Sequence, residues 1–198
     1  MQRISCIGSI GRYALLVGFA LGLLSGAHTA NANEAALWDS LRNGGHFALL
    51  RHALAPGTGD PAGFAIEDCN TQRNLSDHGR AQARQIGHKF RDNGIQTARV
   101  YASQWCRCRD TAELLGLGPV SDQPALNSFY QRWENREPQT RALADWLGRQ
   151  DIGTVHVLVT HQVNITALTG ISPSSGELVI VRAMDNGDLR VVGTIETE

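Results

Sequence analysis

Between residues 34 and 195, short apolar runs alternate with amphipathic stretches. Near-continuous apolar runs are typical of strands that are covered on both faces of a sheet, whereas apolar residues at i, i+3, i+4 and i+7 indicate one face of a helix. This pattern predicts strands at residues 47–50, 99–102, 155–159, 178–182 and 189–195. It predicts helices at residues 34–41, 77–92, 109–115, 140–149 and 165–168. Because strands and helices alternate, we expect the α/β fold class, as a three-layer α/β/α sandwich with a mostly parallel central sheet.

Two polar segments interrupt this pattern. Residues 55–74 are rich in Gly, Pro, Asp and Thr and have neither helical nor strand periodicity, so they predict a long loop. Long loops in compact domains are usually functional or disordered, and this one directly follows the first strand. We therefore expect it to border any site at the end of that strand. Residues 185–188, Asp-Asn-Gly-Asp, predict a hairpin between the last two strands.

The first 32 residues have the pattern of a secretory signal peptide. Arg3 and Arg12 precede an apolar run at residues 13–24, and small residues follow up to Ala30-Asn31-Ala32. The apolar run is too short for a comfortable membrane span, although an uncleaved anchor is the alternative. We expect cleavage near Ala32, a mature domain at residues 33–198, and a periplasmic or secreted protein with no stable membrane anchor.

The charge of the chain gives no sign of a nucleic-acid partner. The formal net charge is −1, from 18 basic and 19 acidic residues. Removal of the first 32 residues would change it to −3, because that segment holds two arginines and no acid. A chain so close to neutral lacks the basic surface that nucleic-acid binding requires.

Three of the four cysteines would remain after cleavage: Cys69, Cys106 and Cys108. Their spacing matches no zinc-binding pattern, so we predict no metal site. An oxidising compartment would let disulfides persist, and an odd number of cysteines leaves at least one thiol outside an intrachain pair. If the protein is exported, we expect Cys69 to pair with Cys106 or Cys108, which would tie the long loop to the segment around residue 107.

Three predicted strand ends carry the side chains of a candidate site. The first strand ends in Arg51-His52, the second leads into a helix start that holds Arg107, and the third leads to His161. The carboxyl ends of parallel strands lie at one edge of a sheet, where ligands bind. Arginine binds anionic oxygens through a planar fork, and a neutral histidine can act as a nucleophile. Together these residues predict phosphoryl chemistry.

The motifs around these residues resemble those of the histidine phosphatase superfamily, also called phosphoglycerate mutase-like. Leu50-Arg51-His52-Ala53 is similar to its Arg-His-Gly signature, with Ala53 in the glycine position. Residues 69–83, 103–112 and 159–161 resemble, in turn, its loop and helix start, its second-arginine segment and its second histidine motif. The resemblance covers nearly all of the mature chain and implies a phosphoglycerate mutase-like sandwich with phosphatase activity.

The resemblance also implies a role for each residue. His52 would attack phosphorus and form a phosphohistidine that water then hydrolyses. Arg51, Arg107 and His161 would bind the equatorial oxygens and supply the positive charge that phosphoryl transfer needs. No metal and no cofactor would take part. The partner would be a small phosphorylated substrate, such as an envelope phosphosugar or another phosphomonoester, or phosphohistidine on a second protein.

The chain departs from the family in its proton donor. The mutase and phosphatase branch carries a Glu in a Leu-x-Glu context, and here Leu126-Asn127-Ser128 places Ser128 at that position. Glu134, in Arg132-Trp133-Glu134, is the candidate substitute. The alternative is that Glu134 is a solvated loop carboxylate without a catalytic role.

Two other functions remain open at this point. A non-catalytic module that binds a phosphosugar or another anion would keep the pocket, but would not need His52 as a nucleophile. A metal-dependent hydrolase that used His52, His161 and Cys69 would lose its activity on chelation of the metal.

Overall fold

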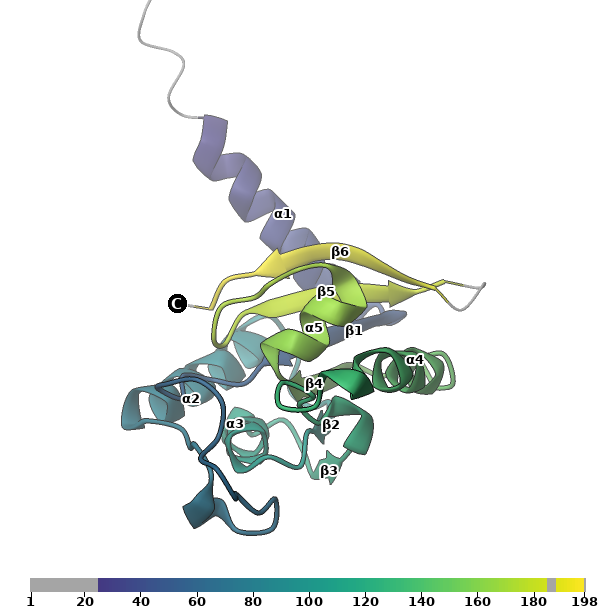
Figure 1. Ribbon diagram of the computed structural model, residues 1–198. Helices are drawn as coiled ribbons and strands as arrows, with labels where there is room; N and C mark the ends of the chain where they lie inside the picture. Colours follow the sequence, from purple (N-terminus) through teal and green to yellow (C-terminus); the bar gives the residue numbers. More distant parts are fainter. Residues whose placement is uncertain (1–24, 185–187, 198) are drawn as a thin grey trace, which may run out of the picture.

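The computed structural model describes residues 25–184 and 188–197, with side chains from residue 33 onwards (Figure 1). One six-stranded sheet, in the order β3-β2-β4-β1-β5-β6, forms its centre. The strands are β1 (His46–Arg51), β2 (Arg99–Ala102), β3 (Val120–Asp122), β4 (His156–Thr160), β5 (Leu178–Ala183) and β6 (Leu189–Ile195). Strands β3, β2, β4 and β1 are parallel neighbours, while β5 pairs antiparallel with both β1 and β6. The predicted, mostly parallel sheet is confirmed.

Helices cover both faces of the sheet. They are α1 (Ser25–Arg42), α2 (Asp77–Asp92), α3 (Cys106–Leu115), α4 (Arg136–Leu147) and α5 (Gln162–Thr169), with short 3₁₀ turns η1 (Cys69–Thr71), η2 (Pro124–Leu126) and η3 (Trp133–Asn135). On one face, Ala48 and Leu50 of β1 pack in a core with α1, α2 and α3. On the other, Phe47 and Leu49 pack in a second core with α4 and α5. This alternation along β1 gives the predicted three layers.

The structure differs from the predicted elements in one strand and in several helix boundaries, since α3, α4 and α5 each begin three or four residues before the predicted start. Strand β3 was not predicted, because it has three residues and Val120 is its only apolar one, so no alternation marks it. Helix α1 begins at Ser25 rather than at residue 34 and runs through the expected cleavage site at Ala30–Ala32. The apolar run of the signal-peptide pattern lies outside the described residues, so cleavage and export stay predictions. No described helix is both long and apolar enough to cross a membrane. Strands β5 and β6 pair as expected, while the predicted turn at residues 185–187 also lies outside the described part.

The end of β1 is fixed against α2 by a close backbone approach. Ser76 caps α2 by accepting a hydrogen bond from Gly79 N at 3.0 Å, which is the role that serine commonly has at a helix start. A Cβ atom on Gly79 would lie 2.0 Å from the carbonyl oxygen of Leu54, so only glycine lets the chain leaving β1 pass over the helix. Gln82 then accepts from Leu54 N at 2.9 Å and donates to Ser175 O at 2.9 Å. These contacts hold the backbone next to His52 in place.

The loop at residues 55–74 is fastened to α3 by a disulfide between Cys69 and Cys106, whose Cα atoms are 5.7 Å apart. This is one of the two pairings expected from the sequence. Cys108 is the free cysteine of the described residues and is buried. Because Cys69 is oxidised, it is not available as a thiolate ligand, which removes one member of the metal-hydrolase alternative.

Candidate active site

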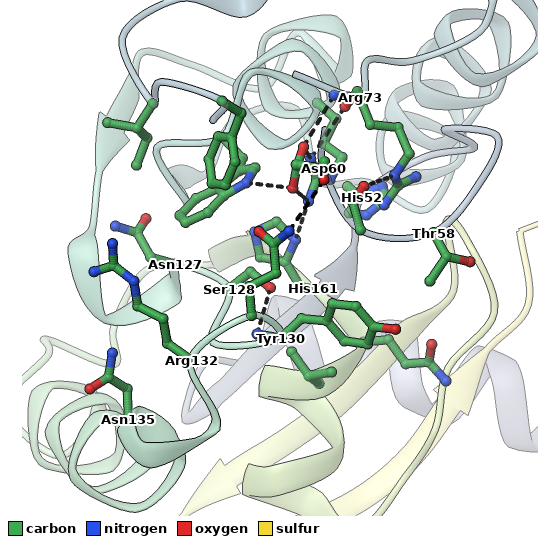
Figure 2. A pocket seen from close by; sticks show the side chains of 18 of the residues that line it. His52, Thr58, Asp60, Arg73, Asn127, Ser128, Tyr130, Arg132, Asn135 and His161 are labelled. Atoms are coloured by element: carbon green, nitrogen blue, oxygen red, sulfur yellow. Dashed lines mark hydrogen bonds and ion pairs between the residues drawn. The ribbon is translucent and has the colours of Figure 1, made fainter. Parts of the chain in front are cut away.

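A pocket of about 610 Å³ opens at the carboxyl ends of β1, β2 and β4 (Figure 2). Its lining includes Arg51, His52, Arg107 and His161. The topology brings these four together because β4 lies between β1 and β2 in the sheet and all three strands run in the same direction. The part of the sequence prediction that depended on parallel strand ends therefore holds in three dimensions.

His52 is held as a neutral imidazole with one ring nitrogen free. The side chain is buried, and its Nδ1 donates a hydrogen bond to the carbonyl oxygen of Ala53, the next residue, at 2.8 Å. The proton is therefore on Nδ1 and the lone pair is on Nε2. Burial, followed by the charge of Arg107, lowers the pKa of His52 to about 3 against the opposing effect of the Ala53 hydrogen bond. Ala53 N in turn donates to Thr111 Oγ1 of α3 at 3.1 Å. The group at this position is thus an unprotonated imidazole near neutral pH, which is the state that a histidine nucleophile requires.

His161 faces His52 across the pocket. It follows β4 as the N-cap residue of α5, and the centroids of the two imidazole rings are 5.5 Å apart. Its Nε2 lies 2.8 Å from Ser103 Oγ, and its Nδ1 lies 3.5 Å from Nη2 of Arg107. Burial, followed by the charge of Arg107, lowers the pKa of His161 well below its usual value. Both histidines are therefore neutral in this pocket.

Arg107 lies in the first turn of α3 and is paired with an aspartate that the sequence analysis missed. Its Nη1 and Nη2 donate to Oδ1 and Oδ2 of Asp60 at 2.7 and 3.1 Å. Asp60 comes from the loop at residues 55–74, which was expected to border the site. That expectation was the signal available in the sequence, but nothing in the loop's composition singled out this residue.

A third arginine, Arg73, was also missed and lines the same pocket. Its Nε donates to Gly59 O at 2.7 Å, and its Nη1 donates to Ala55 O. Burial lowers the pKa of Arg73, and the nearby charges of Arg107 and Arg51 act in the same direction. Arg51 itself donates from Nη1 to Pro173 O at 2.8 Å. We call the part of the pocket around His52 and His161 the inner pocket. It holds the guanidinium groups of Arg51, Arg73 and Arg107 against the buried carboxylate of Asp60, a formal surplus of two positive charges.

Two guanidinium donors in this pocket have no protein acceptor. Among the described residues, Nε of Arg51 and Nε of Arg107 are buried and have no hydrogen-bond partner. Buried N–H groups are nearly always paired in folded proteins, and an unpaired one carries a desolvation cost that an anionic ligand would remove. These donors and the surplus of positive charge suit a phosphoryl dianion.

Glu134 is not brought to the pocket. It lies in η3 with an exposed side chain, and it is absent from the lining, whereas its neighbours Arg132 and Asn135 belong to it. Ser128, which stands in the expected donor position, lines the pocket (Figure 2). This geometry favours the alternative that Glu134 is a solvated loop carboxylate.

Comparisons with known proteins find one matching family model and several solved structures of similar fold. A family model described as Histidine phosphatase superfamily (branch 1) matches residues 47–154, more than half of the chain. A comparison with curated proteins found no match. Among solved structures, the protein histidine phosphatase SixA complexed with tungstate is 17% identical with a TM-score of 0.55, covering 77% of this chain and 97% of its own.

Two further solved structures share the fold. A phosphoserine phosphatase from Entamoeba histolytica, in complex with 3-phosphoglyceric acid, is 13% identical with a TM-score of 0.56, covering 77% of this chain and 98% of its own. A mycobacterial glucosyl-3-phosphoglycerate phosphatase is 16% identical with a TM-score of 0.52, and the match covers 75% of this chain and 97% of that protein. At such identities the likeness establishes the fold and leaves the substrate open.

Proposed function

Because the chain belongs to the histidine phosphatase superfamily, branch 1, we propose that it is a metal-independent phosphatase that works through a phosphohistidine on His52. The observation that carries the proposal is the state of His52. Its Nε2 lone pair is free, its pKa is lowered to about 3, and the guanidinium groups of Arg51, Arg73 and Arg107 line the same pocket. A module that only binds anions would have no use for a buried, unprotonated histidine in this position, so we place that function second.

The proposed reaction has two displacements at phosphorus. The lone pair of His52 Nε2 forms a P–N bond while the P–O bond to the leaving group breaks, and the leaving oxygen takes a proton from solvent. Water then forms a P–O bond and gives a proton back to solvent, the P–N bond breaks, and inorganic phosphate leaves with His52 neutral again. Arg51, Arg107 and His161 surround the transferred group and stabilise the charge on its equatorial oxygens, with Arg73 as a further cation beside them.

We infer that the substrate is a small phosphorylated molecule with a polar body, such as an envelope phosphosugar. The pocket is much larger than a phosphoryl group, and its outer part carries Tyr130, Arg132 and Asn135 (Figure 2). An aromatic ring with neighbouring hydrogen-bond donors suits a hydroxyl-rich ring. Since no carboxylate stands at the usual donor position, phosphohistidine or another activated phosphate with a good leaving group is the second candidate.

Export to the periplasm or the medium is part of this proposal. The signal-peptide pattern supports it, and so does the disulfide between Cys69 and Cys106, because such bonds persist in oxidising compartments. Mass spectrometry of the mature protein from the cell envelope tests it. A chain that retains Met1 would contradict cleavage near Ala32.

The test of the phosphatase function compares His52→Ala with the wild type on nitrophenyl phosphate and a panel of phosphosugars. We expect the variant to fold and to lose all activity, since the nucleophile is gone. Brief exposure to labelled substrate should leave an acid-labile, base-stable phosphoprotein in the wild type alone. His88→Ala is the matched control, because His88 is an exposed histidine on α2. Full activity in His52→Ala would refute the mechanism, and activity that EDTA abolishes would favour a metal-dependent hydrolase.

A further inference from the structure

Asp60 is the buried carboxylate of the inner pocket, and it is bonded to the arginine expected to bind the phosphoryl group. The exposed fractions of the two side chains are 4% for Asp60 and 3% for Arg107. Besides the two hydrogen bonds from Arg107, Asp60 accepts from Trp105 Nε1 at 3.0 Å and from Arg73 N at 3.1 Å. Four donors thus fix both carboxylate oxygens. A carboxylate held this firmly can in turn orient the group to which it is bonded.

The orientation matters because a guanidinium group has two bidentate edges. One edge consists of Nη1 and Nη2, and the other consists of Nε with Nη2. Asp60 accepts both hydrogen bonds of the first edge, and Nη1 donates its second hydrogen to Arg73 O at 3.2 Å. On the second edge, Nε is buried without a partner among the described residues, and the remaining hydrogen of Nη2 makes one long hydrogen bond, of 3.5 Å, with His161 Nδ1.

We propose that Asp60 is a positioning residue of the phosphatase reaction, which holds Arg107 by one edge so that the Nε/Nη2 edge faces the phosphoryl site beside His52 and His161. This inference rests on the proposed function. Asp60 acts through Arg107 and does not itself touch the substrate. Its charge also offsets part of the repulsion between Arg107 and Arg73, which both lie close to it.

Asp60 does not replace the missing proton donor. Burial by itself would raise the pKa of this carboxyl, but the hydrogen bonds and charge of Arg107 outweigh burial and hold its pKa below the usual value. A group that stays ionised has no proton to give to a leaving alkoxide. Positioning and acid catalysis therefore make opposite predictions for the dependence on the leaving group.

The first test is Asp60→Asn, which keeps the shape of the side chain and removes its charge. We expect kcat to fall about 10²-fold, the cost of a misplaced catalytic group, for nitrophenyl and alkyl phosphates alike. KM should not rise, because the variant pocket has one negative charge fewer to compete with the phosphate. The matched control is Asp122→Asn, which breaks a similar but more exposed fork with Arg109 outside the pocket. We expect that variant to keep the wild-type kcat and KM.

The second test is a double-mutant cycle. If Asp60 acts through Arg107, then Asp60→Asn should cause little further loss of kcat in an Arg107→Ala background. An equal loss in both backgrounds would overturn the proposal. So would wild-type or increased activity of Asp60→Asn, or a loss confined to alkyl phosphates, since that pattern belongs to a general acid.

Calorimetric titration with inorganic phosphate and with orthovanadate separates this inference from the proposed function, because neither measurement needs turnover. We expect Asp60→Asn to bind phosphate at least as tightly as the wild type does. It should bind vanadate more weakly, since a five-coordinate vanadate requires the oriented Arg107. If the wild type showed no turnover but Asp60→Asn still bound phosphate normally and vanadate more weakly, the phosphatase function would fail. The orientation of Arg107 by Asp60 would still stand. Parallel changes for both anions would refute the positioning role.

Discussion

Removal of the disulfide between Cys69 and Cys106 should destabilise the domain by a predictable amount. The two cysteines are 37 residues apart. Opening a loop of that length restores conformational entropy to the unfolded chain, which the chain-entropy relation converts to about 4 kcal/mol at 25 °C. For a domain of this size we expect the melting temperature to fall by about 10 °C. The bond also anchors the loop that carries Asp60 and Arg73, so activity should fall as well.

Thermal unfolding followed by circular dichroism, with and without reductant, measures this effect. The control is the double variant Cys69→Ser with Cys106→Ser, which should melt where the reduced wild type melts and should not respond to reductant. Cys108 cannot replace the lost thiols easily, because burial raises its pKa to about 12 and keeps it a thiol. An unchanged melting temperature after full reduction would refute the entropic argument. Three thiols in the unfolded, non-reduced mature protein would rule out the bond itself.

Three more predictions concern the pocket. Arg107→Ala and His161→Ala should each lower kcat by about 10² to 10³, as the loss of one oxyanion contact does, and circular dichroism should show both variants folded; near-normal turnover of either would remove that residue from the proposed mechanism. Since burial lowers the pKa of His52 to about 3 and also lowers that of His161, the folded state binds fewer protons than the unfolded state below about pH 6.5. The free energy of unfolding should therefore decrease as the pH falls from about 6.5 towards 3, which urea titrations at several pH values measure. The pH–rate profile of kcat/KM should show no histidine titration near pH 6.5. A rate that halves near pH 6.5 would contradict the lowered pKa of His52. Glu134→Gln should change turnover of alkyl and nitrophenyl phosphates equally and little, because Glu134 is exposed and does not line the pocket; a strong, selective loss on alkyl phosphates would restore it as the proton donor.

The sequence by itself determined five of the six strands that the structure describes and the four residues expected at the strand ends. The apolar runs of β1 and β4 are buried on both faces. Their composition therefore indicates both that they are strands and that helices cover both sides of them. Once these strands are parallel, Arg51, His52, Arg107 and His161 must meet at one edge whatever the loops do. Local signals were sufficient here, as they were for Ser76, whose hydroxyl needs only the next turn of its own helix.

Only the tertiary structure decided which loop residues enter the pocket. Asp60 and Arg73 lie in a segment without periodicity, and their partners are Arg107 and backbone groups that the fold brings to them. The same is true of the choice between Cys106 and Cys108, which are two residues apart on α3: one faces the loop and the other faces His161. The two alternatives for Glu134 stayed open in the sequence for the converse reason, since its nearness in sequence to Ser128 says nothing about which way η3 turns it. Periodicity records burial against a sheet or a helix, whereas the position of a loop side chain depends on long-range contacts that leave no repeating pattern in the sequence.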